Sequence, residues 1–305
     1  MTAGGYSPNL SKALGAVLFD MQQGNLSDKL PIGVDILTNP EEFEVSKPAI
    51  FTQGSSIYTA FRDDHAAAKD SIQAKTDELG NAMTQNPTWV GAMGRTAMDP
   101  KALHKVLAPY MALHGVGMAM PGNEPWLAVH KAGAYRYGAG ATPLPGVGCL
   151  IWPGTLASHY VLLLPVKPIL ANGIALRDVK SFLETESGLK CLKDHCVVVP
   201  FAIGAVLYVP YGYVYLPLFY DTASTEGSLK TTKNKKKELT FDTHLVFSIF
   251  APQLARDLDL DVWTAIVSST MEVFSKKPAD KLWVSRKSYY DTFLDAVVNS
   301  KVVVR

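Results

Sequence analysis

The feature of this sequence that most limits its fold is a series of short apolar segments between residues 126 and 250. Each segment has the length of a strand, is rich in Val, Leu, Ile or Tyr, and is bounded by turn residues. One helical stretch, at residues 176–184, interrupts them. Strands this dense, without a helix between each pair, favour an antiparallel sandwich or barrel. The segments span residues 149–152, 159–164, 196–199, 205–209, 213–219 and 239–250.

Helical patterns precede the apolar segments. Residues 63–83 contain good helix formers, with two aspartates at the start and Gly80-Asn81 near the end. Residues 99–113 predict a second helix, in which Asp99 suits the N-cap and Pro100 the first helical position. Pro109 lies inside this second pattern, so a break or kink is expected there.

Helical patterns also follow the apolar segments, at residues 259–274 and 285–298. The chain thus divides into a mainly helical region at residues 1–125, a β-barrel core at residues 126–252 and C-terminal helices at residues 253–305. We find no internal repeat and no linker that forces a boundary, so we expect these parts to form one structural domain.

The charge and cysteine content narrow the class of protein. The chain has 29 basic and 28 acidic residues, which argues against nucleic acid or an anionic membrane as a partner and permits self-association. Its three cysteines are a poor disulfide framework and favour a reducing compartment. Residues 1–14 lack a signal-peptide pattern, so we expect an intracellular, cytoplasmic protein.

Residues 202–220 carry no charge and are nearly long enough to span a bilayer. However, Pro210, Gly212 and Pro217 interrupt them, and Val and Tyr favour strands. This stretch therefore predicts two buried strands around a tight turn, and no membrane segment.

Three segments resemble the cupin superfamily, in particular its Jumonji-C-like branch. Asn39-Pro-Glu-Glu-Phe43 with Lys47-Pro-Ala-Ile50 is similar to the family's entry segment, in which an acidic helix leads into a Lys-Pro strand. Residues 160–165 are similar to a strand that ends in Leu-Pro before a short helical insert. Gly204-Ala-Val-Leu-Tyr-Val-Pro210-Tyr-Gly212-Tyr-Val-Tyr215 resembles the late barrel hairpin, Gly-Asp-x-x-x-x-Pro-x-Gly-Trp-x-His.

The resemblance implies an α+β protein with a cupin-like double-stranded β-helix barrel and flanking N- and C-terminal helices. In metal-dependent members the position of Tyr215 is a histidine that binds iron, and the position of Ala205 is an aspartate. The family's upstream His-x-Asp/Glu pair is also missing, because His130 and His159 are followed two residues later by Ala132 and Val161. A two-histidine, one-carboxylate site needs all three ligands to hold Fe(II), so the resemblance implies the barrel without its metal.

Six residues are candidates for lining a ligand cleft. His130 is followed by Tyr135 and Arg136, and the three could line a polar pocket or belong to an ordinary hydrogen-bonded strand. His159 could face the barrel interior or be a satisfied core residue. The remaining two, Tyr213 and Tyr215, fall on one face of a strand by alternation.

Three further segments have both a functional and a structural interpretation. Residues 191–196, Cys-Leu-Lys-Asp-His-Cys, could bind zinc, but they lack a partner pair elsewhere and are typical of a surface turn before a strand. Residues 230–237 contain five lysines, which could touch phosphate or RNA but are typical of a solvated loop. The glycines of residues 133–148 indicate a connector, because no Gly-Lys-Ser/Thr and no helix follow them.

These observations support three functions. The first is a non-catalytic cupin-like binding or scaffold protein with a lost metal site and no cofactor. The second is a divergent Fe(II)/2-oxoglutarate-dependent oxygenase that recruits His130, His159 or His244. The third is a structural subunit of an assembly such as a viral shell, which rests on analogy of fold alone.

Overall fold

The computed structural model describes eleven stretches of the chain. They are residues 47–82, 88–93, 98–113, 126–131, 147–153, 159–201, 204–210, 212–218, 241–250, 261–262 and 264–265. The predicted helix at residues 285–298 and the lysine-rich segment at residues 230–237 lie outside these stretches, and so does most of residues 133–148.

Within the described stretches, nine strands form two antiparallel sheets, which confirms the predicted β-rich core. The six-stranded sheet has the order β1-β7-β4-β9-β3-β2 and the three-stranded sheet the order β6-β5-β8. Closure of these sheets into a barrel stays a prediction. The first sheet consists of β1 (Ala49–Thr52), β2 (Thr88–Ala92), β3 (Trp126–Lys131), β4 (Val147–Pro153), β7 (Ala205–Val209) and β9 (Phe241–Phe250). The second consists of β5 (His159–Pro165), β6 (Val197–Phe201) and β8 (Tyr213–Leu218).

The predicted hairpin at residues 204–215 is wrong in its pairing, although both strands and the turn exist. β7 pairs with β1 and β4, whereas β8 pairs with β5 in the other sheet. The turn between them carries the chain from one sheet to the other, and Gly212 has a φ of 85°, which favours glycine. The carbonyl of Gly212 accepts a hydrogen bond of 2.8 Å from the Val166 amide, which ties the turn to the end of β5.

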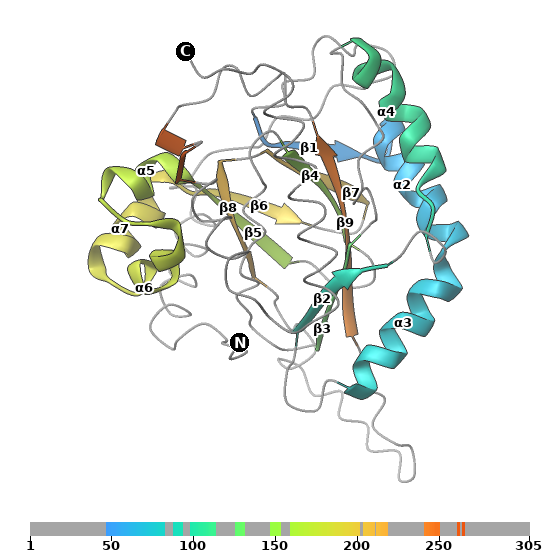
Figure 1. Ribbon diagram of the computed structural model, residues 1–305, viewed down its shortest axis with the longest axis horizontal. Helices are drawn as coiled ribbons and strands as arrows, with labels where there is room; N and C mark the ends of the chain where they lie inside the picture. The colour runs from blue at the N-terminus through green and yellow to red at the C-terminus, as the bar shows by residue number, and fades with distance from the viewer. Residues whose placement is uncertain are drawn as a thin grey trace.

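Three helices cover one face of the six-stranded sheet (Figure 1). They are α2 (Ser56–Ala67), α3 (Lys69–Ala82) and α4 (Lys101–Leu113). The predicted single helix at residues 63–83 is thus two helices, and the first begins earlier because the Ser55 hydroxyl accepts a bond of 3.2 Å from the Tyr58 amide. Pro109 lies inside α4 and does not end it.

A second group of helices follows β5 and lies at the opposite side of the molecule (Figure 1). It comprises α5 (Val166–Ala171), the 3-10 turn η2 (Leu176–Asp178), α6 (Val179–Leu183) and α7 (Glu186–His195). The turn predicted at residues 191–196 is wrong, because all but Cys196 of these residues belong to α7. None of the helices in the described stretches is both long and apolar enough to cross a membrane.

Buried apolar side chains form three clusters. The helix-side cluster lies between α2, α3 and α4 and the six-stranded sheet and includes Phe51, Phe61, Leu103, Trp152 and Phe247. The insert cluster joins α5, α6 and α7 to the outer face of the three-stranded sheet. The inter-sheet cluster lies between the two sheets and consists of Ile151, Val161, Leu163, Val199, Leu207 and Val209.

Candidate functional site

The inter-sheet cluster is aliphatic and tightly buried. Each of its six side chains is 5% exposed or less, and they come from β4 and β7 of one sheet and β5 and β6 of the other. The inner faces of the two sheets are therefore in contact through Val, Leu and Ile side chains. Positions two residues away from these along each strand belong to the same inner faces, and so do the positions directly opposite them in the register.

Tyr213 and Tyr215 lie on β8, opposite Pro165 and Leu163 of β5. Tyr213 is partly buried and packs against the inter-sheet cluster. Its burial raises the pKa of the phenol, and the nearby charge of Lys47 acts in the opposite direction. Tyr213 therefore stays protonated near neutral pH and is able to donate a hydrogen bond at the edge of the cluster.

His159 is the first residue of β5 and lies opposite Phe201 of β6. Alternation with Val161 and Leu163 places its position on the inner face. Tyr213 lies opposite the other end of this seven-residue strand, so the two positions are separated by about 20 Å of strand. His159 and Tyr213 therefore lie at opposite ends of β5, and a cleft that contains all six predicted residues stays a prediction.

His130 lies on β3 directly opposite Asp242 of β9. His244, two residues further along β9, is opposite Ala128 on one side and Pro153 of β4 on the other. Because Val246 is opposite the buried Ile151, alternation places positions 242 and 244 on the inner face, together with position 130. The register thus groups two histidines and one aspartate at neighbouring positions of one sheet face.

Asp242 is the member of this group that the sequence analysis missed. The expected family pair is His-x-Asp/Glu upstream of the strand with Tyr215, whereas residues 242–244 read Asp-Thr-His and come after it. The sequence signal that could have indicated Asp242 was the spacing of the family pair in reverse order, Asp-x-His. Tyr135 and Arg136 lie outside the described residues, so the polar pocket that they were expected to form with His130 stays a prediction.

The cluster at residues 191–196 has a structural explanation. Cys191 and Cys196 are free thiols that are buried against the insert cluster, and burial raises the pKa of Cys196 to about 12. Asp194 is exposed and pairs with Lys190 one turn earlier on α7. Among the side chains that the structure describes, no three metal-binding residues lie together. The cluster is therefore an amphipathic helix end with its thiols inside.

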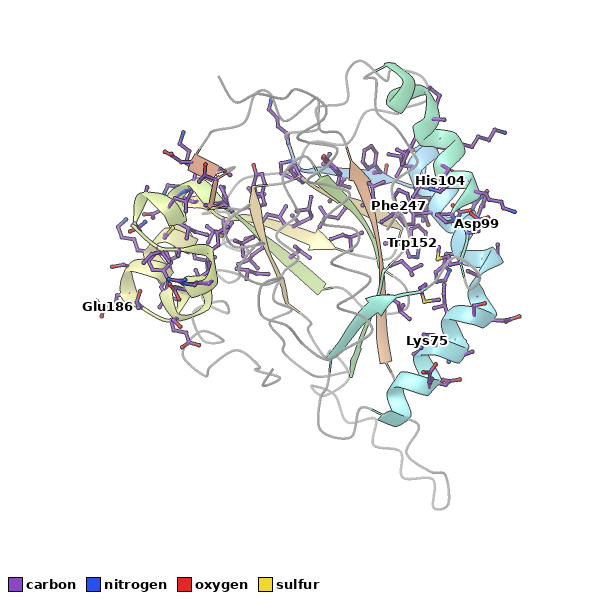
Figure 2. The ribbon with its side chains drawn as sticks, viewed as in Figure 1. Lys75, Asp99, His104, Trp152, Glu186 and Phe247 are labelled. Atoms are coloured by element: carbon purple, nitrogen blue, oxygen red, sulfur yellow. The ribbon has the colours of Figure 1, made fainter. Side chains whose placement is uncertain are left out.

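A buried carboxylate on the helix side caps a helix. Asp64 of α2 accepts hydrogen bonds of 2.9 Å from the amides of Ala102 and Leu103, at the start of α4. Desolvation raises the pKa of Asp64 despite these two bonds. Nearby, His104 meets Phe247 of β9 with ring centroids 5.5 Å apart (Figure 2). These contacts fix α4 against the sheet and α2.

An open groove of about 510 Å³ lies on the helical insert, away from the predicted site residues. Its lining is a mixture of small polar side chains and two apolar ones, with one carboxylate. It is formed by Asn172, Ile174, Asp178, Ser181, Phe182, Thr185 and Ser187.

Comparisons with known proteins find a distant structural similarity. No protein-family model and no curated protein matches the sequence. Among solved structures, the chain is similar to that of YcfD, a ribosomal oxygenase from Escherichia coli, with a TM-score of 0.32 and 10% sequence identity. The match covers 88% of this chain and 68% of the YcfD chain.

Proposed function

We propose that this chain is a non-catalytic cupin-like binding or scaffold protein whose metal site at the position of Tyr215 has been lost. The observation that supports it is the aliphatic inter-sheet cluster. Leu163, directly opposite Tyr215, is fully buried in this cluster with Val161 and Leu207. An Fe(II) centre that uses 2-oxoglutarate needs open coordination positions and polar groups for a dianion. Close-packed aliphatic side chains supply neither, and they make the burial of charge costly.

Tyr213 is the described candidate for contact with a ligand in this proposal. It combines a partly buried aromatic ring with a phenol that stays protonated, at the edge of the inter-sheet cluster. Such a residue offers apolar area and one hydrogen bond to a bound group. A protein of this kind would bind its ligand or partner without converting it to a product.

The test is an assay for turnover of 2-oxoglutarate. Purified full-length chain is supplied with Fe(II), ascorbate and 2-oxoglutarate, and succinate is measured against a no-protein blank. We expect succinate at the level of the blank and no heat of 2-oxoglutarate binding in calorimetry. Fe(II)-dependent succinate release that the His130→Ala variant loses would overturn the proposal.

A divergent Fe(II)/2-oxoglutarate-dependent oxygenase is the second candidate function. The placement of His130, Asp242 and His244 on one sheet face favours it, because two histidines and a carboxylate are the ligand set of non-haem iron oxygenases. The same succinate assay separates the two candidates, since the oxygenase requires turnover and the binding protein excludes it.

A further inference from the structure

The groove on the helical insert is a feature that the proposed function does not use. Its lining comes from the end of α5, from α6 and from the first turn of α7. Its volume of about 510 Å³ falls within the range of about 300–1,000 Å³ that is typical of small-molecule sites. The groove is therefore a candidate binding site of its own, and its lining indicates which ligand it suits.

Asp178 supplies the carboxylate of the groove. It occupies the N-cap position of α6, but its side chain makes no capping hydrogen bond. Its Oδ2 atom lies 3.5 Å from the Nε atom of Arg177, and both side chains are more than half exposed. This distance exceeds the usual hydrogen-bond range of about 2.7–3.2 Å, and an exposed pair of this kind contributes little to stability. The carboxylate is thus available to a cationic ligand.

The neutral polar side chains of the groove leave mainly oxygen acceptors for a ligand. The Asn172 amide donates a hydrogen bond of 2.8 Å to the Pro168 carbonyl, which leaves its oxygen and one N–H for a ligand. The Thr185 hydroxyl donates to the Phe182 carbonyl at 2.7 Å and accepts from the Gly188 amide at 3.1 Å. The hydroxyl proton is therefore used and a lone pair remains. An ammonium group, which has three N–H donors and no acceptor, matches such a lining.

The rest of the lining consists of two apolar side chains and two serines. Ile174 is partly buried and packs against the insert cluster, to which Phe182 belongs. Ser181 and Ser187 are exposed, and their hydroxyls rotate to accept or to donate. Apolar area beside oxygen acceptors suits a chain of methylene groups with charged ends, because such a chain covers apolar surface and keeps its charge in water.

The amino end of α7 acts in the opposite direction, because the amides at a helix start are equivalent to about half a positive charge. Thr185 caps this end, and Glu186 lies in the first turn, at the outer edge of the insert (Figure 2). Residues 177–187 contain three acidic and two basic side chains, so their net charge is 2 − 3 = −1. The helix end does not cancel this charge, and the balance favours a cation over an anion.

We propose that the groove binds a small aliphatic polyamine. The Asp178 carboxylate binds one ammonium group, and the Asn172 and Thr185 oxygens accept hydrogen bonds from the amines. The methylene chain lies along the two apolar side chains of the lining. The site does not include Tyr213 or the inter-sheet cluster, so the inference does not depend on the proposed function.

Three six-carbon ligands that differ only in their end groups test this chemistry. The purified full-length chain is titrated by calorimetry with hexamethylenediamine, hexanediol and adipate, and also with spermidine. We expect the two amines to bind, and the diol and the diacid to give no saturable heat. Because the groove is open, affinity for the amines should fall when the ionic strength rises from about 0.01 M to about 0.15 M.

Substitutions in the lining test the position of the ligand. Asp178→Asn keeps the shape of the side chain and should weaken spermidine binding about fivefold, the upper end of the range for an exposed ion pair. Ser181→Asp adds a carboxylate to the lining and should strengthen binding by a similar factor. Both positions are exposed, so the urea midpoints of the two variants should match that of the wild type. Asp194→Asn, which changes an exposed carboxylate of α7 outside the lining, is the matched control and should leave binding unchanged.

Hydrogen exchange read by mass spectrometry locates the bound amine. Saturating spermidine should slow exchange in residues 172–188 and leave α2 unchanged. Absence of saturable binding by either amine would overturn the inference, as would equal binding of hexanediol or adipate. Equal affinities of the wild type, Asp178→Asn and Ser181→Asp would also overturn it. Succinate release bears on the proposed function alone, so the two proposals fail by separate measurements.

Discussion

At the scale of single residues, Asp64 is a buried polar side chain that joins α2 to the start of α4. It is 6% exposed and satisfies two amides at the start of α4, which belongs to another part of the sequence. Asp64→Ala should lower the free energy of unfolding by about 1–2 kcal/mol, because a helix cap is lost and two amides lose their acceptor. Urea unfolding measures this value.

The neighbouring Asp63 is the matched control. It is half-exposed and pairs with Arg62, also exposed, so Asp63→Ala should change the free energy of unfolding by less than about 1 kcal/mol. Equal losses in the two variants would contradict the role assigned to Asp64.

The pH dependence of stability provides a second test at Asp64. Desolvation raises its pKa above the ordinary 3.8, so the folded state holds the proton more tightly than the unfolded state. The stability linked to this proton is present below pH 3.8 and is lost as pH rises through the raised pKa. The wild type should therefore lose stability relative to Asp64→Asn, which does not titrate, as pH increases over that window. Urea unfolding of both proteins at several pH values measures the difference between their free energies of unfolding. If the wild type instead gained stability relative to Asp64→Asn as pH rises, the predicted direction of the pKa shift would be contradicted.

Some residue roles could be predicted from the sequence and others could not. Gly212 was expected at a turn and has a positive φ, as does Gly204. Asp242 was missed, because its relation to His130 depends on the register of two strands that are far apart in sequence. The capping role of Asp64 was missed for the same reason, since its hydrogen-bond partners, Ala102 and Leu103, belong to α4, which is distant in sequence.

At the scale of secondary-structure elements, the close approach of α6 and α7 depends on a glycine. A Cβ at Gly188 would stand 1.9 Å from the Phe182 carbonyl oxygen and 2.8 Å from the Leu183 Cα. These are backbone atoms and cannot rotate away. Gly188→Ala should therefore lower the free energy of unfolding by about 1–3 kcal/mol, the range for overpacking. Gly54→Ala, which meets no atom within 4 Å, should change it by less than about 0.5 kcal/mol. Similar urea midpoints for the two variants would contradict this account.

Most strands could be predicted from the sequence, whereas one helix and the division of the strands between two sheets could not. The apolar strands from β4 onward were found because their side chains alternate or run together between turn residues. α7 was missed, although its buried Gly188, Cys191 and Leu192 have helical spacing, because its polar residues suggested a turn. Assignment of β7 and β8 to different sheets was not predictable, since a Pro-x-Gly turn fits both a hairpin and a crossing between sheets.

At the scale of the whole molecule, the inter-sheet cluster joins two halves that each have a core of their own. Leu163→Ala should lower the free energy of unfolding by about 2–5 kcal/mol, because Leu163 is fully buried between the sheets. Val197→Ala, at a partly buried position beside the same cluster, should lower the free energy of unfolding by less than Leu163→Ala does, and urea unfolding measures both values.

Because the cluster couples the halves, hydrogen exchange of the wild type should show α2–α3 and α6–α7 opening in one cooperative transition. Exchange of the two helix pairs at clearly different free energies would show that the halves unfold separately.

The order of the six-stranded sheet also affects the protein while it is being made. β9 is the last strand among the residues that the structure describes, and it lies between β4 and β3, so within the described sheet it joins β1-β7-β4 to β3-β2. Until residues 241–250 leave the ribosome, the edges of β3 and β4 that receive them lack their partner, and an unpaired edge can pair with another chain. A nascent chain stalled before β9 should therefore need a chaperone that shields strand edges, and the need should end when this strand is released.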